Sequence, residues 1–93
     1  MAKIIWTLRS MNDIKSIYDF ISLDSQTYAK RFIQKLVLRV EQLNAFPDSG
    51  RIVPEKEDPS IRELIEGNYR IFYRIHRGNI YIIRIYNSAR RIK

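Results

Sequence analysis

Cysteine is absent from the sequence, and His76 is its only histidine. These absences exclude a disulfide framework, a thiolate metal site and a multi-histidine metal site, so we expect neither a metal nor a cofactor. No apolar run approaches the length of about 18 residues that a membrane-spanning helix needs, and we expect no membrane partner. The segment Met1–Ser10 lacks the long apolar core and the small-residue cleavage site of a signal peptide. We therefore expect a cytoplasmic protein.

Negative charge is scarce in the last third of the chain. Residues 1–60 carry 9 Lys/Arg and 8 Asp/Glu, a net charge of +1, whereas residues 61–93 carry 8 and 2, a net charge of +6. A basic region of this kind suits a polyanionic partner, either nucleic acid or an acidic protein, unless it is only a soluble basic surface. The length of 93 residues and a hydrophobic content of 45% favour one folded domain over residues 1–93.

Two helices are predicted after a first strand at Lys3–Thr7. Ser10 is the candidate N-cap of the first helix, in which apolar residues between Met11 and Ile21 recur at spacings of three and four. Ser25 is the candidate cap of the second, whose apolar stripe runs from Ala29 to Leu43. The short break between them predicts an antiparallel helical hairpin. A membrane-surface helix is the alternative, but the strands that follow need a helical cover.

The period of the apolar residues changes to two after a loop at 47–60. Three strands are predicted beyond it, Ile61–Glu66, Tyr69–His76 and Ile80–Tyr86, separated by glycine-containing turns. The order β-α-α-β-β-β predicts an α+β fold in which the helical hairpin packs on one face of a small antiparallel sheet. The other face is left for function.

Alternation within Tyr69–His76 assigns its side chains to these two faces. One set, predicted to face the helices, is Tyr69, Ile71, Tyr73 and Ile75. The other set is Arg70, Phe72, Arg74 and His76. We expect both tyrosines of the first set and Trp6 to belong to the core, and His76 to be a solvated turn residue.

Five segments occur in the order and at the spacing found in one known group of proteins. They are Ile4–Thr7, Leu43-x-x-Phe46-Pro47-x-x-Gly50-Arg51, Ile61–Leu64, Asn68-Tyr69-Arg70-Ile71-x-Tyr73-x-Ile75 and Ser88-Ala89-Arg90. With them, nearly the whole chain resembles the RelE/ParE superfamily of toxins from type II toxin–antitoxin systems. The third segment followed by the fourth is typical of the ParE branch.

The resemblance implies a toxin that arrests growth and is silenced by an acidic antitoxin encoded beside it, in a toxin–antitoxin hetero-oligomer. ParE-like members poison DNA gyrase and are not nucleases. RelE-like members enter the ribosomal A site and cut mRNA without a metal ion. A non-catalytic nucleic-acid-binding module is a third hypothesis, because it needs only the basic surface.

The candidate site residues follow from this resemblance. In the nuclease interpretation, Arg70 and Arg90 match arginines that hold the phosphorane charge, and Tyr86 is the substitute for a missing C-terminal tyrosine or histidine. Nuclease members tend to carry lysines or a glutamate on the strand before this arginine, and here that stretch offers Arg62, Glu63 and Glu66. Arg62 and Glu63 would also suit cross-strand ion pairs. This incomplete catalytic set favours a gyrase inhibitor that is not an enzyme. The residues expected to bind the target or the antitoxin are Arg62, Arg70, Arg74, Arg84, Arg90 and Arg91.

Overall fold

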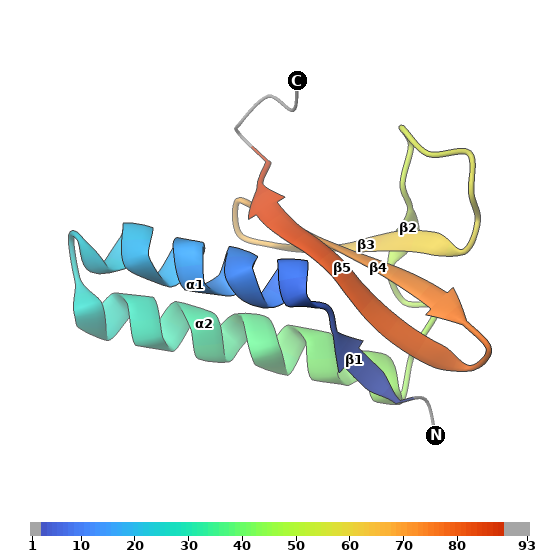
Figure 1. Cartoon of the computed structure of the whole chain (residues 1–93), viewed down its shortest axis with the longest axis horizontal. Helices are drawn as coiled ribbons and strands as arrows, with labels where there is room; N and C mark the ends of the chain where they lie inside the picture. Colours follow the sequence, from blue (N-terminus) through green and yellow to red (C-terminus); the bar gives the residue numbers. More distant parts are fainter. Residues whose placement is uncertain (1–2, 89–93) are drawn as a thin grey trace.

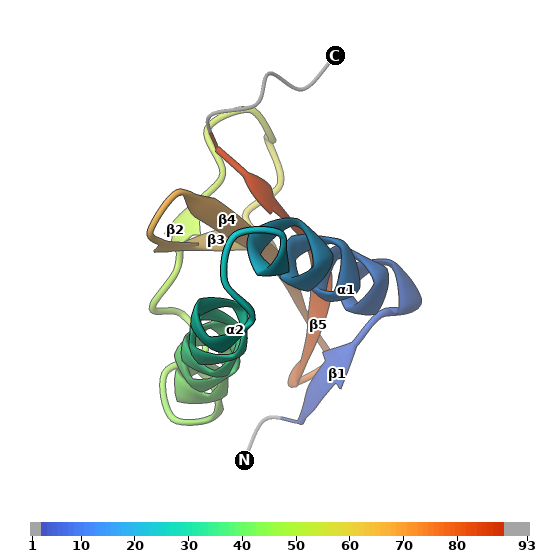
Figure 2. The same cartoon turned by 90° about the vertical axis from the view of Figure 1, so that its left-hand side faces the viewer.

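Two helices and a twisted sheet form the protein, as the sequence predicts. The computed structural model describes residues 3–88. Figures 1 and 2 show the helices side by side as a hairpin, lying against one face of the sheet. The elements in chain order are β1 (Ile4–Trp6), α1 (Leu8–Ser22), α2 (Gln26–Glu41), a 3₁₀ turn (Gln42–Asn44), β2 (Arg51–Ile52), β3 (Ile61–Glu66), β4 (Tyr69–His76) and β5 (Asn79–Asn87). The predicted α+β fold is therefore confirmed.

The sheet has five strands in the order β1-β5-β4-β3-β2. The neighbouring pairs from β5 to β2 are antiparallel, whereas β1 runs parallel to β5. The sheet is thus mixed, a detail that side-chain alternation does not reveal, because it reports faces rather than strand direction. The strand β2 was not predicted either, because two residues in a loop are too short to display a period.

The core lies between the helices and the inner face of the sheet, as expected. Leu36 and Val40 of α2 are fully buried there, and so are Ile71 and Tyr73 of β4. Burial of each such apolar side chain contributes about 1.5–3 kcal/mol. Trp6 is partly buried and packs against this cluster, and the predicted division of β4 into two faces is confirmed.

The start of α1 differs from the prediction. Thr7, not Ser10, is the N-cap, and its Oγ1 accepts a hydrogen bond from the Ser10 amide at 3.2 Å. The same hydroxyl donates to the Ile82 carbonyl at 2.6 Å, so it also provides a hydrogen-bond partner for β5 just after β1 ends. Ser25 caps α2 as predicted, because its Oγ accepts from the Tyr28 amide at 3.1 Å.

A bulge in β5 decides which of its side chains reach the outer face. Phe72 pairs with Arg84 and Tyr73 pairs with Ile82, so Ile83 is an extra residue between the two pairs. Alternation shifts by one position at this residue. As a result Arg84 lies opposite Phe72, and Tyr86 lies opposite Arg70, all on the face that the helices leave uncovered.

Candidate functional site

An open cleft of about 800 Å³ lies on the outer face of the sheet. Its floor is formed by β4 and β5, one wall by the loop between β2 and β3, and another by the start of α1. Residues that line it include Arg9, Lys56, Arg70, Phe72, Arg84 and Tyr86. The lining therefore combines cations with aromatic rings, on the face where the sequence predicts function.

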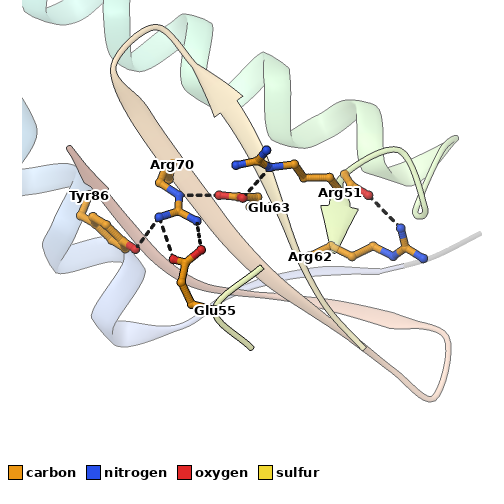
Figure 3. Close-up of polar contacts among 7 residues, drawn as sticks. Arg51, Glu55, Arg62, Glu63, Arg70 and Tyr86 are labelled. Carbon is orange, nitrogen blue, oxygen red and sulfur yellow. Dashed lines mark hydrogen bonds and ion pairs between the residues drawn. The ribbon is translucent and has the colours of Figure 1, made fainter. Parts of the chain in front are cut away.

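Arg70 stands near the start of β4 with its guanidinium held by two carboxylates (Figure 3). Its Nε donates to Glu63 Oε1 at 2.5 Å, while Nη1 and Nη2 donate to the two oxygens of Glu55 at 3.0 and 3.2 Å. The Tyr86 hydroxyl lies 3.5 Å from Nη1. Only 14% of the Arg70 side chain is exposed. The arginine that the sequence assigns to a phosphate is thus paired with carboxylates of its own chain.

Glu63 is the buried centre of this ion-pair network. Its side chain is fully buried, and its second oxygen accepts from Arg51 Nε at 2.7 Å. Burial alone would raise the pKa of the Glu63 carboxyl, but the hydrogen bonds from Arg70 and Arg51 outweigh it and hold the pKa below its usual value. The hydrogen bond that Arg70 donates to Glu63, followed by those that it donates to Glu55, raises the pKa of Arg70. Glu63 therefore forms ion pairs, which was the alternative that the sequence offered for it.

The segment that leads into β2, ahead of the loop that carries Glu55, is fixed from the opposite face of β4. Tyr73 Oη donates to the Pro47 carbonyl at 2.8 Å and accepts from the Gly50 amide at 2.9 Å. Gly50 has no room for a side chain, because a Cβ there would lie 2.5 Å from Tyr73 Oη. Arg62 Nη1 donates to the Gly50 carbonyl at 2.8 Å. Arg62, expected at the binding surface, therefore holds the segment before β2 instead and does not line the cleft.

The other predicted arginines are divided between the cleft and the end of the chain. Arg74 lines the cleft, is 44% exposed, and lies 3.4 Å from Asp58 Oδ2. Arg84 lines it as well, is 40% exposed, and has its Nε 3.6 Å from Asp13 Oδ2. Arg90 and Arg91 lie outside the described residues. His76 is exposed at the end of β4, as predicted, and is not among the residues that line the cleft.

Glu55 is the residue of this site that the sequence did not reveal. It brings a carboxylate beside an arginine and a phenol, the types of group that acid–base catalysis uses. The hydrogen bond from Arg70 lowers the pKa of Glu55, which makes it a weaker base, and burial raises the pKa of Tyr86, which keeps its hydroxyl protonated. Among residues 3–88, no three His, Asp or Glu side chains gather in a way that could hold a metal ion. No helix in the same range is long and apolar enough to cross a membrane.

Comparison with known proteins agrees with the resemblance of the five segments. Residues 4–92 match the family described as the ParE toxin of the type II toxin–antitoxin system parDE. The chain is 32% identical over 91 residues to Toxin RelE2 of Caulobacter vibrioides, covering 97% of this chain and 99% of that one. It also resembles a solved chain of the chromosomal ParDE system from P. aeruginosa, with a TM-score of 0.78, 28% identity, and coverage of 94% and 96%. The chain therefore belongs to the ParE toxin family of type II toxin–antitoxin systems.

Proposed function

We propose that this toxin inhibits DNA gyrase by binding it, without catalysing a reaction. The observation that carries the proposal is the filled fork of Arg70. With its Nε donating to Glu63 and its two Nη atoms donating to Glu55, this arginine is already paired with two carboxylates of its own chain. Arginine stabilises a transition state only when its donors are available to the developing charge. Arg70 is thus better suited to maintaining the fold than to catalysis.

Binding would use the cations that surround Arg70. Arg9, Lys56, Arg74 and Arg84 lie around one cleft, next to the apolar side chains of Phe72 and other strand residues. A surface with a partly apolar centre and a charged rim is typical of protein–protein interfaces, in which charge guides the encounter. Figure 2 shows the helices packed against the other face of the sheet, so only the start of α1, with Arg9, borders this surface.

A supercoiling assay with purified gyrase tests the proposal. The toxin should block supercoiling, and the double variant Arg74→Gln/Arg84→Gln should need about ten-fold more protein for the same inhibition, because interface arginines often dominate binding. Lys30→Gln/Arg31→Gln is the matched control, since Lys30 and Arg31 are exposed cations on α2. Intact supercoiling at a large molar excess of toxin contradicts the proposal.

One observation favours a second candidate, the ribosome-dependent endoribonuclease. Glu55, Arg70 and Tyr86 converge on the cleft, and they would supply a base, a cation and an acid (Figure 3). Primer extension on mRNA in a translating extract should then detect cuts at codon spacing. Tyr86→Phe should lose about 100-fold or more in cleavage rate, because the acid would be gone. If the toxin arrests growth but the mRNA stays uncut, this candidate function is excluded.

We also propose that an acidic antitoxin, encoded beside the toxin, neutralises it in a hetero-oligomer. The family and the excess of positive charge, +7 over the chain, support this partner. Expression of the toxin alone should arrest growth, and coexpression of the neighbouring acidic protein should restore it. Arrest that the neighbour does not relieve contradicts the pairing.

A further inference from the structure

The loop between β2 and β3 places carboxylates over the basic strand β4. We call residues 54–58, with the sequence Pro-Glu-Lys-Glu-Asp, the acidic strap. Glu55 of the strap pairs with Arg70, and Asp58 pairs with Arg74. The strap is anchored at its two ends, by the buried Val53 and by the hydrogen bond from the Ile61 amide to the Asp58 carbonyl at 3.1 Å. It is thus an acidic peptide, supplied by the chain itself, on the face where a partner is expected.

The two carboxylates that hold Arg70 differ in how easily they are replaced. Glu63 is fully buried in β3 and binds the inner edge of the guanidinium. The side chain of Glu55 is 54% exposed and binds the outer pair, Nη1 and Nη2. Solvent already competes for the Glu55 carboxylate, so its ion pair is weak. Loss of the Glu63 pair would instead leave a buried carboxylate without one of its two arginine partners. A ligand could therefore take the outer pair of nitrogens and leave the fold intact.

We propose that Glu55 is an internal substitute for a carboxylate of an acidic peptide segment, which displaces the strap and binds Nη1 and Nη2 of Arg70. The proposal rests on the proposed function insofar as the antitoxin is the protein that supplies this segment. Arg74 lines the same cleft and would pair with a further carboxylate once Asp58 of the strap has moved away. The strap then acts as a competitor that any acidic partner must displace.

The aromatic rings of the cleft favour a peptide over a nucleic acid. Single-stranded nucleic acids bind such clefts largely by stacking bases on aromatic faces. Here the Arg70 guanidinium lies 4.9 Å from the Phe72 ring centroid and 5.9 Å from that of Tyr86, and the Arg84 guanidinium lies 5.7 Å from the latter. Phe72 and Tyr86 also pack edge to face at 5.0 Å. Arginines and the neighbouring ring thus occupy the positions that bases would need, whereas the exchange of one carboxylate for another needs no repacking.

The test compares two substitutions in the strap with equal charge change. Fluorescence anisotropy measures the affinity of labelled decaglutamate, and of a ten-residue oligothymidine, for the wild type, Glu55→Gln and Glu57→Gln. Glu57 is an exposed residue of the same strap and is not one of the two carboxylates that pair with Arg70. Removal of the competitor should make Glu55→Gln bind decaglutamate about five-fold more tightly than Glu57→Gln does. Equal gains in the two variants overturn the proposal, and so does the absence of decaglutamate binding to any of the three proteins.

Oligothymidine binding and a hydrogen-exchange measurement distinguish displacement of the strap from general attraction between opposite charges. A gain for oligothymidine as large as the gain for decaglutamate would favour phosphate and overturn the peptide proposal. Hydrogen exchange at Lys56, whose amide bonds to the Val53 carbonyl at 3.1 Å, should speed up in the wild type when decaglutamate binds. Protection or no change at this amide means that the strap is not displaced. None of these titrations contains gyrase, so failure of the gyrase target and failure of the strap proposal are distinguished.

Discussion

The two faces of β4 bind the segment 47–60 with different chemistry. On the inner face, Tyr73 holds Pro47 and Gly50 by two neutral hydrogen bonds inside the core. On the outer face, Arg70 holds Glu55 by charged hydrogen bonds at the surface of the cleft. A neutral bond in a dry interior resists salt and pH, whereas a charged bond that reaches solvent exchanges with other ions. The inner attachment therefore sets where the loop begins, and the outer attachment leaves its acidic part able to respond to a partner.

Removal of Arg70 should have the largest effect on stability. Arg70→Ala leaves the fully buried Glu63 with Arg51 as its remaining partner in the network, at a cost of about 3 kcal/mol in the free energy of unfolding. Chemical denaturation measures this loss. The matched control is Arg70→Met/Glu63→Gln, which removes both charges and should recover most of the stability. An unchanged denaturation midpoint in Arg70→Ala would mean that the guanidinium serves the partner and not the fold.

On the inner face, Gly50→Ala should cost about 2 kcal/mol, because overpacking in a filled space displaces its neighbours. The added Cβ would lie 2.5 Å from Tyr73 Oη and 2.7 Å from the Glu63 carbonyl oxygen. Thermal unfolding measures the loss. Gly78→Ala is a useful comparison, because its Cβ would meet no atom within 4 Å and only its φ of 77° opposes the substitution. A larger loss at Gly78 than at Gly50 would show that the inner attachment is not tightly packed.

Acid should weaken the buried ion pairs of Glu63 by a smaller amount, because a protonated Glu63 carboxyl still bonds to one arginine. The folded pKa of Glu63 lies below its unfolded value, near 4.5, so the stability that ionised Glu63 contributes is complete above that value. It is lost as the pH falls through the lower folded pKa. Denaturation between pH 6 and about pH 3 should thus show a steeper loss in the wild type than in Glu63→Gln. Parallel curves would exclude Glu63 as a source of the acid sensitivity.

Much of this architecture follows from residue periods. Alternation in Tyr69–His76 assigns Tyr73 to the core and Arg70 to the opposite face, and both positions are confirmed. The apolar stripe after Ser25 likewise predicts α2 and its cap. These predictions succeed because burial on one side of a regular element imposes a period on the sequence.

The loop and the bulge could not be predicted in the same way. Glu55 reaches Arg70 across 15 residues of chain, in a segment with no period, and the only signal was an acidic run before a basic strand. The bulge at Ile83 shifts the alternation of β5, so both faces of this strand look apolar in the sequence. The site therefore depends on features that tertiary contacts fix, whereas the fold depends on features that recur along the chain.

The smallest effects should come from two tyrosine hydroxyls, one on each face. Tyr73→Phe leaves the Pro47 carbonyl and the Gly50 amide without their buried partner and should cost about 1–2 kcal/mol. Tyr86→Phe removes only a 3.5 Å contact to Arg70, keeps the ring against Phe72, and should change stability by less than about 0.5 kcal/mol. Urea denaturation of the two variants measures both values. Equal losses would mean that the outer hydroxyl is as closely bound as the inner one, and the contrast between a fixed and an exchangeable face would fail at the position where it is easiest to test.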